Sequence, residues 1–117
     1  MKIGIYGGTF NPIHRGHLTA ARAAMDVLGL DRLLLIPASV PPHKALPQGS
    51  ADAADRLEMA ALACAELGPQ AQALDTELHR TGPSYTVDTL RQLRMEHPED
   101  ELWLLMGTDM FLSLSLI

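Results

Sequence analysis

The sequence has little cysteine, few aromatic residues and no long apolar run. Its single cysteine, Cys64, excludes an intramolecular disulfide and lies among alanines with no activating base beside it, so we interpret it as a buried packing residue. The longest apolar stretches, such as 33–36, are far shorter than the roughly 20 residues that a membrane-spanning helix needs. The first residues leave no room for the apolar segment of a secretory signal before the glycines begin. We therefore expect a cytoplasmic protein that does not bind a membrane.

Basic residues are also scarce. Nine Lys and Arg stand against fourteen Asp and Glu, for a formal net charge of -5. A broad electrostatic surface for nucleic acid or anionic lipid is therefore not expected, and any bound anion must be held locally. The 117 residues, of which 47% are hydrophobic, suffice for one domain with a buried core. We predict a single domain over 1–117.

Short apolar runs alternate with helical patterns along the chain. The runs at 3–6, 33–36 and 102–106 have the continuous character of strands that are covered on both faces, as in a parallel sheet. Residues 73–78 are a weaker strand candidate. Alternation of this kind predicts an α/β domain with right-handed crossovers, in which ligands bind at the carboxyl ends of the strands.

Three helical patterns lie between these runs. The first ends at Gly29 and the second at Gly68, residues suited to helix ends, and the third starts near Ser84 and ends before His97 because Pro98 follows. The predicted apolar faces are, in order, Leu18, Ala21, Met25 and Leu28; Leu57, Ala60, Ala61, Cys64 and Leu67; and Val87, Leu90 and Leu93.

The segment 7–17 leaves the first predicted strand and enters the first helix. Gly7 and Gly8 let the backbone turn sharply and approach a ligand, and a helix start presents unpaired N–H groups to negative charge. This arrangement suits a phosphate, although the spacing matches neither the dinucleotide-binding G-x-G-x-x-G motif nor a P-loop. A plain strand-to-helix turn is the alternative.

Two histidines, His14 and His17, flank Gly16 at a spacing of three. This spacing can direct both imidazoles toward one point, where both could donate hydrogen bonds to one phosphate. Zinc ligation is the alternative, but the segment has neither the adjacent Glu of H-E-x-x-H nor a cysteine pair. We therefore favour phosphate binding and predict no metal ligand here.

The segment 7–17, with the pattern H-x-G-H at 14–17, resembles the signature region of the nucleotidyltransferase superfamily. Further matching blocks follow in similar order and spacing at 41–44, 56–59, 80–90 and 107–110. The blocks 84–86 and 107–109 make the resemblance specific to the bacterial nicotinate mononucleotide adenylyltransferases. The resemblance implies a Rossmann-like parallel sheet flanked by helices, and transfer of AMP from ATP to nicotinate mononucleotide in NAD biosynthesis. It also implies Mg²⁺ to offset the triphosphate charge.

The same resemblance implies roles for individual residues. His14 and His17 are the implied catalytic residues, and Tyr85 and Thr86 are implied to bind nicotinate mononucleotide. Alternatives remain: Lys44 as a solvated surface residue, Asp109 as the cap of a following helix, and packing for Tyr85. Arg56 is interpreted as structural or salt-bridging. The residues implied to bind ATP are Gly8, Thr9, Phe10, His14, His17, Lys44, Gly107 and Asp109.

Members of this family continue well beyond the block at 107–109, with a Trp that stacks on the nicotinate ring and an Ile-Ser-x-Thr-x-Ile-Arg segment that closes over ATP. We therefore expect a domain that is incomplete at its C-terminus, with an exposed apolar segment at 111–117 through which copies could associate. Two alternative functions stay open. One is another H-x-G-H adenylyltransferase, such as phosphopantetheine adenylyltransferase, and the other is a non-catalytic nucleotide-binding fragment.

Overall fold

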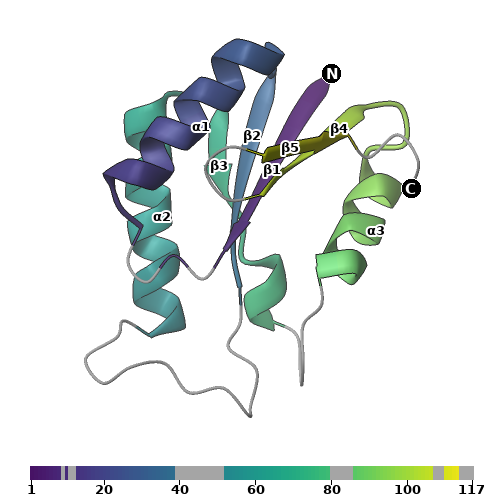
Figure 1. Ribbon diagram of the computed structural model, residues 1–117. Helices are drawn as coiled ribbons and strands as arrows, with labels where there is room; N and C mark the ends of the chain where they lie inside the picture. The colour runs from purple at the N-terminus through teal and green to yellow at the C-terminus, as the bar shows by residue number, and fades with distance from the viewer. Residues whose placement is uncertain (9, 11–12, 39–51, 80–85, 107–109, 114–117) are drawn as a thin grey trace.

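The computed structural model describes residues 1–8, 10, 13–38, 52–79, 86–106 and 110–113. Strands and helices alternate from the first strand to the fourth, and a fifth strand follows (Figure 1). The elements are β1 (Lys2–Gly8), α1 (Arg15–Leu28), β2 (Arg32–Pro37), α2 (Ala53–Leu67), β3 (Ala71–Ala73), the 3-10 helix η1 (Thr76–His79), α3 (Thr86–Glu96), β4 (Glu101–Met106) and β5 (Met110–Ser113).

One sheet has the strand order β3-β2-β1-β4-β5. The first four strands in this order are parallel, and β5 pairs antiparallel with β4. Helices α1 and α2 lie on one face of the sheet and α3 on the other, as Figure 1 shows. The predicted α/β fold with a parallel sheet is confirmed, and the three apolar runs are β1, β2 and β4.

Each face of the sheet has its own hydrophobic cluster. Alternate residues of β2 divide between them: Leu33 and Leu35 join the cluster under α1 and α2, whereas Leu34 and Ile36 join the cluster under α3. This alternation follows from the period of two along a strand. Because both faces of β2 are covered, all of its residues after Arg32 are buried.

Two of the predicted helix ends are confirmed in detail. Gly29 adopts a left-handed conformation with φ of 64° after the last residue of α1, and its N–H donates to the carbonyl of Met25. Helix α3 ends at Glu96, before Pro98. The end of α2 at Gly68 is also as predicted.

The predicted faces of α2 and α3 are wrong at two positions. Ala61 is exposed, because the buried stripe of α2 starts at Arg56 and so runs through 60, 63 and 64 instead of starting at Leu57. Val87 is 46% exposed, because Thr89 takes the buried position in the first turn of α3. In both helices a polar residue, Arg56 in α2 and Thr89 in α3, is among the buried residues.

The weak strand prediction at 73–78 is wrong beyond Ala73. The N–H of Leu74 still donates to the carbonyl of Leu35, at 2.8 Å, but the chain then turns into η1, where the N–H of Leu78 donates to the carbonyl of Asp75. The true strand is β3, which begins before the predicted range. Alanine and glutamine have weak strand preference, so the strand exists because it pairs with β2.

The alternative of a helix directly after Asp109 is also wrong, because residues 110–113 form β5. Trp103 pairs with Ser113 and Met106 with Met110, so the chain reverses directly after β4. A connection as short as 107–109 can join only antiparallel strands. Residues 114–117 lie outside the described residues, so association through the segment 111–117 stays a prediction.

None of the helices in the described part of the chain combines the length and the apolar character needed to cross a membrane.

The left-handed conformation of Gly29 gives a first prediction. Replacing Gly29 with Ala is expected to lower the free energy of unfolding by about 1 kcal/mol, because a side chain at φ of 64° is strained although no atom lies within 4 Å of the added carbon. Urea denaturation measures the change. Gly29→Asn is the control, because Asn tolerates this conformation and should cost less. Equal stability of the Ala variant and the unmodified chain would contradict the assignment of strain.

Candidate functional site

The predicted site lies where β1 and β2 end and α1 begins. The N–H of Ala38, just beyond β2, donates to the carbonyl of Gly8 at 2.8 Å, so the two strand ends are held together. The N-termini of α1 and α2 lie at the same edge of the sheet as these strand ends (Figure 1). The carboxyl edge of a parallel sheet is the usual place for a ligand in such folds.

Two imidazoles cap the N-terminus of α1. Nδ1 of His14 accepts a hydrogen bond from the N–H of Gly16, and Nδ1 of His17 accepts one from the N–H of His14, both at 3.0 Å. The two rings therefore form a reciprocal capping box, with imidazoles in the places that a Ser or Thr and a Glu usually occupy. The structure thus brings the two predicted catalytic residues together, with ring centroids 4.0 Å apart.

Gly16 is required by this arrangement. A Cβ atom at position 16 would lie 2.8 Å from Cε1 of His14, closer than side-chain atoms approach. The ring of His14 can fold back over the helix start only because residue 16 has no side chain. The glycine in the H-x-G-H pattern therefore makes room for an imidazole, a role that spacing alone did not predict.

The capping bonds also determine which ring nitrogen carries the proton. A nitrogen that accepts a hydrogen bond has no proton of its own, so in the neutral rings of His14 and His17 the proton is on Nε2. Both rings consequently have an Nε2–H group available as a donor. Two such donors on adjacent rings, beside a helix N-terminus, can bind one anionic group.

Aromatic side chains surround His17. Its ring makes edge contacts with Phe10, at 5.1 Å between centroids and 87° between planes, and with Tyr6 at 6.1 Å. Partial burial lowers the pKa of His17, and the neighbouring His14 lowers it further. His17 is therefore neutral at pH 7, as its role as a hydrogen-bond acceptor in the cap requires.

Phe10 supports His17 with its side chain. The residue is 3% exposed, and it has a φ of 49°, a left-handed value that is costly for a bulky side chain. In the sequence analysis Phe10 was named only as a residue implied to bind ATP. The packing of its ring against Tyr6 and His17 was missed. The only available signal was an aromatic residue inside a Gly-rich and His-rich turn.

Arg56 has the structural role that the sequence predicted. It is 2% exposed, and its Nη1 donates to the carbonyl of Ala38 at 2.8 Å, just beyond the end of β2. Burial lowers the pKa of Arg56, and Asp52 opposes this effect. The guanidinium thus holds α2 to the strand end that is bonded to Gly8.

Other predicted site residues cannot be placed in this geometry. Thr86 is the first residue of α3, and its side chain lies outside the described part. The remaining ones, Thr9, Lys44, Tyr85, Gly107 and Asp109, lie outside the described residues.

The residues that the structure describes contain no group of three or more His, Cys, Asp or Glu placed to hold a metal ion. In His14 and His17 the backbone amides already occupy Nδ1, so each ring has only Nε2 for a further ligand. This part of the chain thus offers no oxygen cage of the kind that Mg²⁺ or Ca²⁺ prefers.

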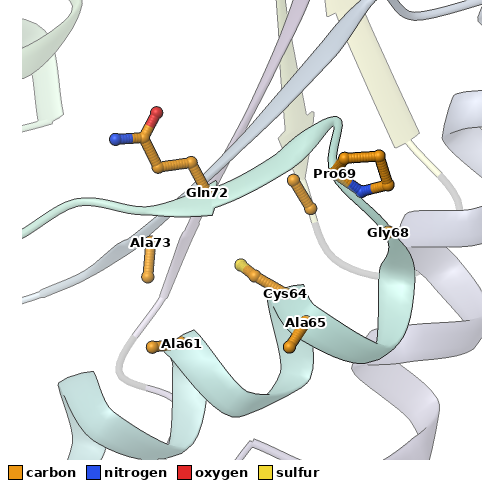
Figure 2. A pocket seen from close by; sticks show the side chains of 8 residues that line it. Ala61, Cys64, Ala65, Gly68, Pro69, Gln72 and Ala73 are labelled. Carbon is orange, nitrogen blue, oxygen red and sulfur yellow. The ribbon is translucent and has the colours of Figure 1, made fainter.

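A separate groove lies between α2 and β3 (Figure 2). Burial raises the pKa of the Cys64 thiol there to about 11, so this cysteine is not a nucleophile at neutral pH. The structure confirms that Cys64 is buried and free of any disulfide. The groove is lined mostly by small side chains, from Ala61, Cys64, Ala65, Gly68, Pro69, Ala71, Gln72 and Ala73.

The neutral imidazole cap gives a second prediction. Nitrogen NMR of the imidazole rings should show His17 protonated on Nε2 and titrating below its ordinary pKa of 6.5. Because the folded pKa is lowered, the contribution of His17 to stability is complete above pH 6.5 and is lost as the pH falls below that value. The urea-denatured chain is the control. A folded pKa above 6.5, or a proton on Nδ1 of the neutral ring, would contradict the geometry.

The comparisons with known proteins agree with this geometry. The family described as cytidylyltransferase-like matches residues 5–116. A protein of Geobacter sp. (strain M21) named probable nicotinate-nucleotide adenylyltransferase is 50% identical over 98% of this chain and 52% of its own length. A protein of the same name from Thermus thermophilus is 51% identical over 95% of this chain and 58% of its own length. The chain therefore spans about half the length of these curated relatives.

Solved structures share the fold. Plasmodium falciparum nicotinic acid mononucleotide adenylyltransferase complexed with NaAD matches with a TM-score of 0.73 and 20% identity, over 88% of this chain and 50% of that one. The same enzyme complexed with APC matches with a TM-score of 0.69 and 18% identity, over 88% of this chain and 49% of that one. Because the family match covers nearly the whole sequence, and the strand-to-helix turn with its two imidazoles lies within it, this chain belongs to the cytidylyltransferase-like family.

Proposed function

We propose that this chain forms the nucleotide-binding part of an adenylyltransferase that makes nicotinate adenine dinucleotide and pyrophosphate from ATP and nicotinate mononucleotide. The observation that carries the proposal is the pair of adjacent Nε2–H donors on His14 and His17 at the carboxyl end of β1. The names of two relatives that are 50% and 51% identical to this chain support nicotinate mononucleotide as the acceptor. The solved neighbour in complex with NaAD, the proposed product, supports it further.

The reaction needs no nucleophile from the protein. A phosphate oxygen of nicotinate mononucleotide attacks the α-phosphorus of ATP and forms a new P–O bond. The bond from the α-phosphorus to the bridging oxygen breaks, and pyrophosphate leaves with that electron pair. Catalysis then depends on alignment of the reactants and on stabilisation of the charge that develops on the phosphoryl oxygens.

His14 and His17 supply that stabilisation as hydrogen-bond donors. Because the capping bonds hold both rings, the Nε2–H groups point in a fixed direction before the substrate binds, and no reorganisation is needed during the reaction. The N-terminus of α1 adds the partial positive charge of its backbone N–H groups. In this mechanism a lowered pKa is an advantage for His17, because protonation on Nδ1 would break the cap that orients the ring.

Mg²⁺ is proposed as a companion of the nucleotide. The described residues provide no carboxylate cage near His14 and His17, so phosphate oxygens and water would hold the ion. Roles for Lys44, Gly107 and Asp109 on ATP, and for Tyr85 and Thr86 on the acceptor, stay predictions from the family resemblance.

The proposal is tested by incubating the chain with ATP, Mg²⁺ and nicotinate mononucleotide and following pyrophosphate release. Pyrophosphate release with nicotinate mononucleotide as the acceptor, and none with phosphopantetheine, is the expected result. Saturable ATP binding without pyrophosphate release would instead favour a nucleotide-binding module.

Two substitutions separate chemistry from folding and give a third prediction. His17→Gln keeps a side chain that can complete a capping box, and His14→Asn keeps a good N-cap, but each removes one imidazole Nε2–H group, and an amide that caps the helix places its own N–H at a different position. Each is expected to lower the rate of pyrophosphate release roughly 100-fold, in line with removal of one donor from an anion-stabilising site.

The stability of these variants is the control. Both should unfold within about 0.5 kcal/mol of the unmodified chain, whereas His14→Ala, which has no capping group, should lose about 1 kcal/mol or more. If the Gln and Asn variants lose activity only in proportion to the fraction that is unfolded, the imidazoles have no chemical role.

A further inference from the structure

A buried carboxylate outside the imidazole site is unexplained by the proposed chemistry. Glu77, in η1, is only 6% exposed, although carboxylates are rarely buried without a specific partner. Its Oε2 accepts a hydrogen bond from the hydroxyl of Thr89 at 2.9 Å, and Thr89 is itself 2% exposed. A carboxylate in such a place loses hydration and must be compensated by interactions of defined geometry.

The bond joins two segments at the carboxyl edge of the sheet. η1 follows β3, and the N–H of Leu74 between them still donates to the carbonyl of Leu35 in β2, so the start of this segment is fixed to the sheet. Thr89 lies in the first turn of α3, which begins at Thr86. The Glu77–Thr89 bond, between residues 12 positions apart, therefore connects the sheet edge to the beginning of α3.

The apolar contacts of α3 do not provide the same restraint. Leu90 and Leu93 pack in the cluster that contains Ile36 and Leu102, and this packing holds the helix against the sheet. Hydrophobic packing has no preferred direction, however, so it permits small shifts of a helix along its axis. A hydrogen bond to a carboxylate is directional and stronger than one between neutral groups. It therefore fixes the position of the first turn along the helix axis.

The position of that first turn matters for the proposed reaction. Figure 1 shows α3 and η1 on the opposite side of the sheet edge from the start of α1, with the ends of β1 and β2 between them. Tyr85 and Thr86, the predicted acceptor-binding residues, stand at or directly before the first residue of α3.

We propose that Glu77 is a positioning residue that sets the first turn of α3 for binding of the acceptor nucleotide, through its hydrogen bond with Thr89. The inference rests on the proposed function for the identity of the acceptor. It assigns to Glu77 no contact with substrate. Loss of the bond should therefore weaken acceptor binding and leave the binding of ATP and the chemical step unchanged.

Thr89→Val tests the inference, because Val has the shape of Thr without the hydroxyl. Its apparent KM for nicotinate mononucleotide should rise roughly tenfold, with kcat and the KM for ATP within about twofold of the unmodified chain, in keeping with loss of one hydrogen bond to a charged group. Thr89→Ser keeps the hydroxyl, so its KM for nicotinate mononucleotide should stay near that of the unmodified chain. Glu77→Gln keeps an acceptor oxygen without the charge, so its KM should lie between those of the unmodified chain and Thr89→Val. Equal losses for ATP and acceptor would overturn the inference and make Glu77 only structural.

Hydrogen exchange provides a readout that needs no ligand. The amides of Leu90 and Arg91 bond to carbonyls of the first turn of a helix that starts at Thr86, so in Thr89→Val they should exchange at least tenfold faster than in Thr89→Ser. The amides of β1 should not change. If the unmodified chain does not bind nicotinate mononucleotide, the proposed function fails, and hydrogen exchange alone decides whether Glu77 positions α3. Unchanged exchange in Thr89→Val would overturn that role.

Discussion

The two hydrogen bonds between backbone N–H groups and the Nδ1 atoms of His14 and His17 determine most of what this site can do. They satisfy orphan donors at the start of α1, hold the rings 4.0 Å apart and leave Nε2 of each neutral ring as a donor. One set of contacts therefore begins the helix and leaves one donor on each of two adjacent rings. The structural role and the proposed chemical role thus fall on opposite nitrogens of the same two rings.

The rest of the fold supports that turn from beneath. Phe10 packs on the edge of His17 and against Tyr6 of β1, which places an apolar layer under the imidazoles. On the other side of β1, Ala38 donates to the carbonyl of Gly8 and Arg56 donates to the carbonyl of Ala38. A continuous series of contacts thus runs from α2, through the ends of β2 and β1, to the start of α1. Phe10 has a left-handed φ of 49°, which is costly for a bulky residue. Burial of its ring against Tyr6 and His17 offsets that cost.

The carboxyl edge of the sheet has two supported regions of different character. On the side of α1 the support is the imidazole cap, in which the groups that stabilise the helix are also those proposed for chemistry. On the side of α3 the support is the bond between Glu77 and Thr89, in which a buried carboxylate takes no part in the proposed chemistry. This division fits a reaction that must hold a triphosphate and a second nucleotide in line, because each substrate needs a region whose position is set independently of the other.

Local patterns were enough to predict the α/β class, the apolar strands, the helix ends at Gly29 and Gly68 and the pairing of His14 with His17, because these depend on residues within a few positions of one another. Patterns failed where a distant partner decided the outcome. Arg56 is buried on α2, where it bonds to the carbonyl of Ala38 beyond the end of β2. Thr89, and not Val87, is buried in the first turn of α3, where it bonds to Glu77. Ala71–Ala73 and Met110–Ser113 are strands that pair with β2 and β4. The sequence alone determined which groups could act on a phosphate. Only the tertiary structure decided that both imidazoles accept hydrogen bonds from backbone N–H groups through Nδ1 and leave Nε2 as the donor, because that depends on the exact approach of the two rings to the start of α1.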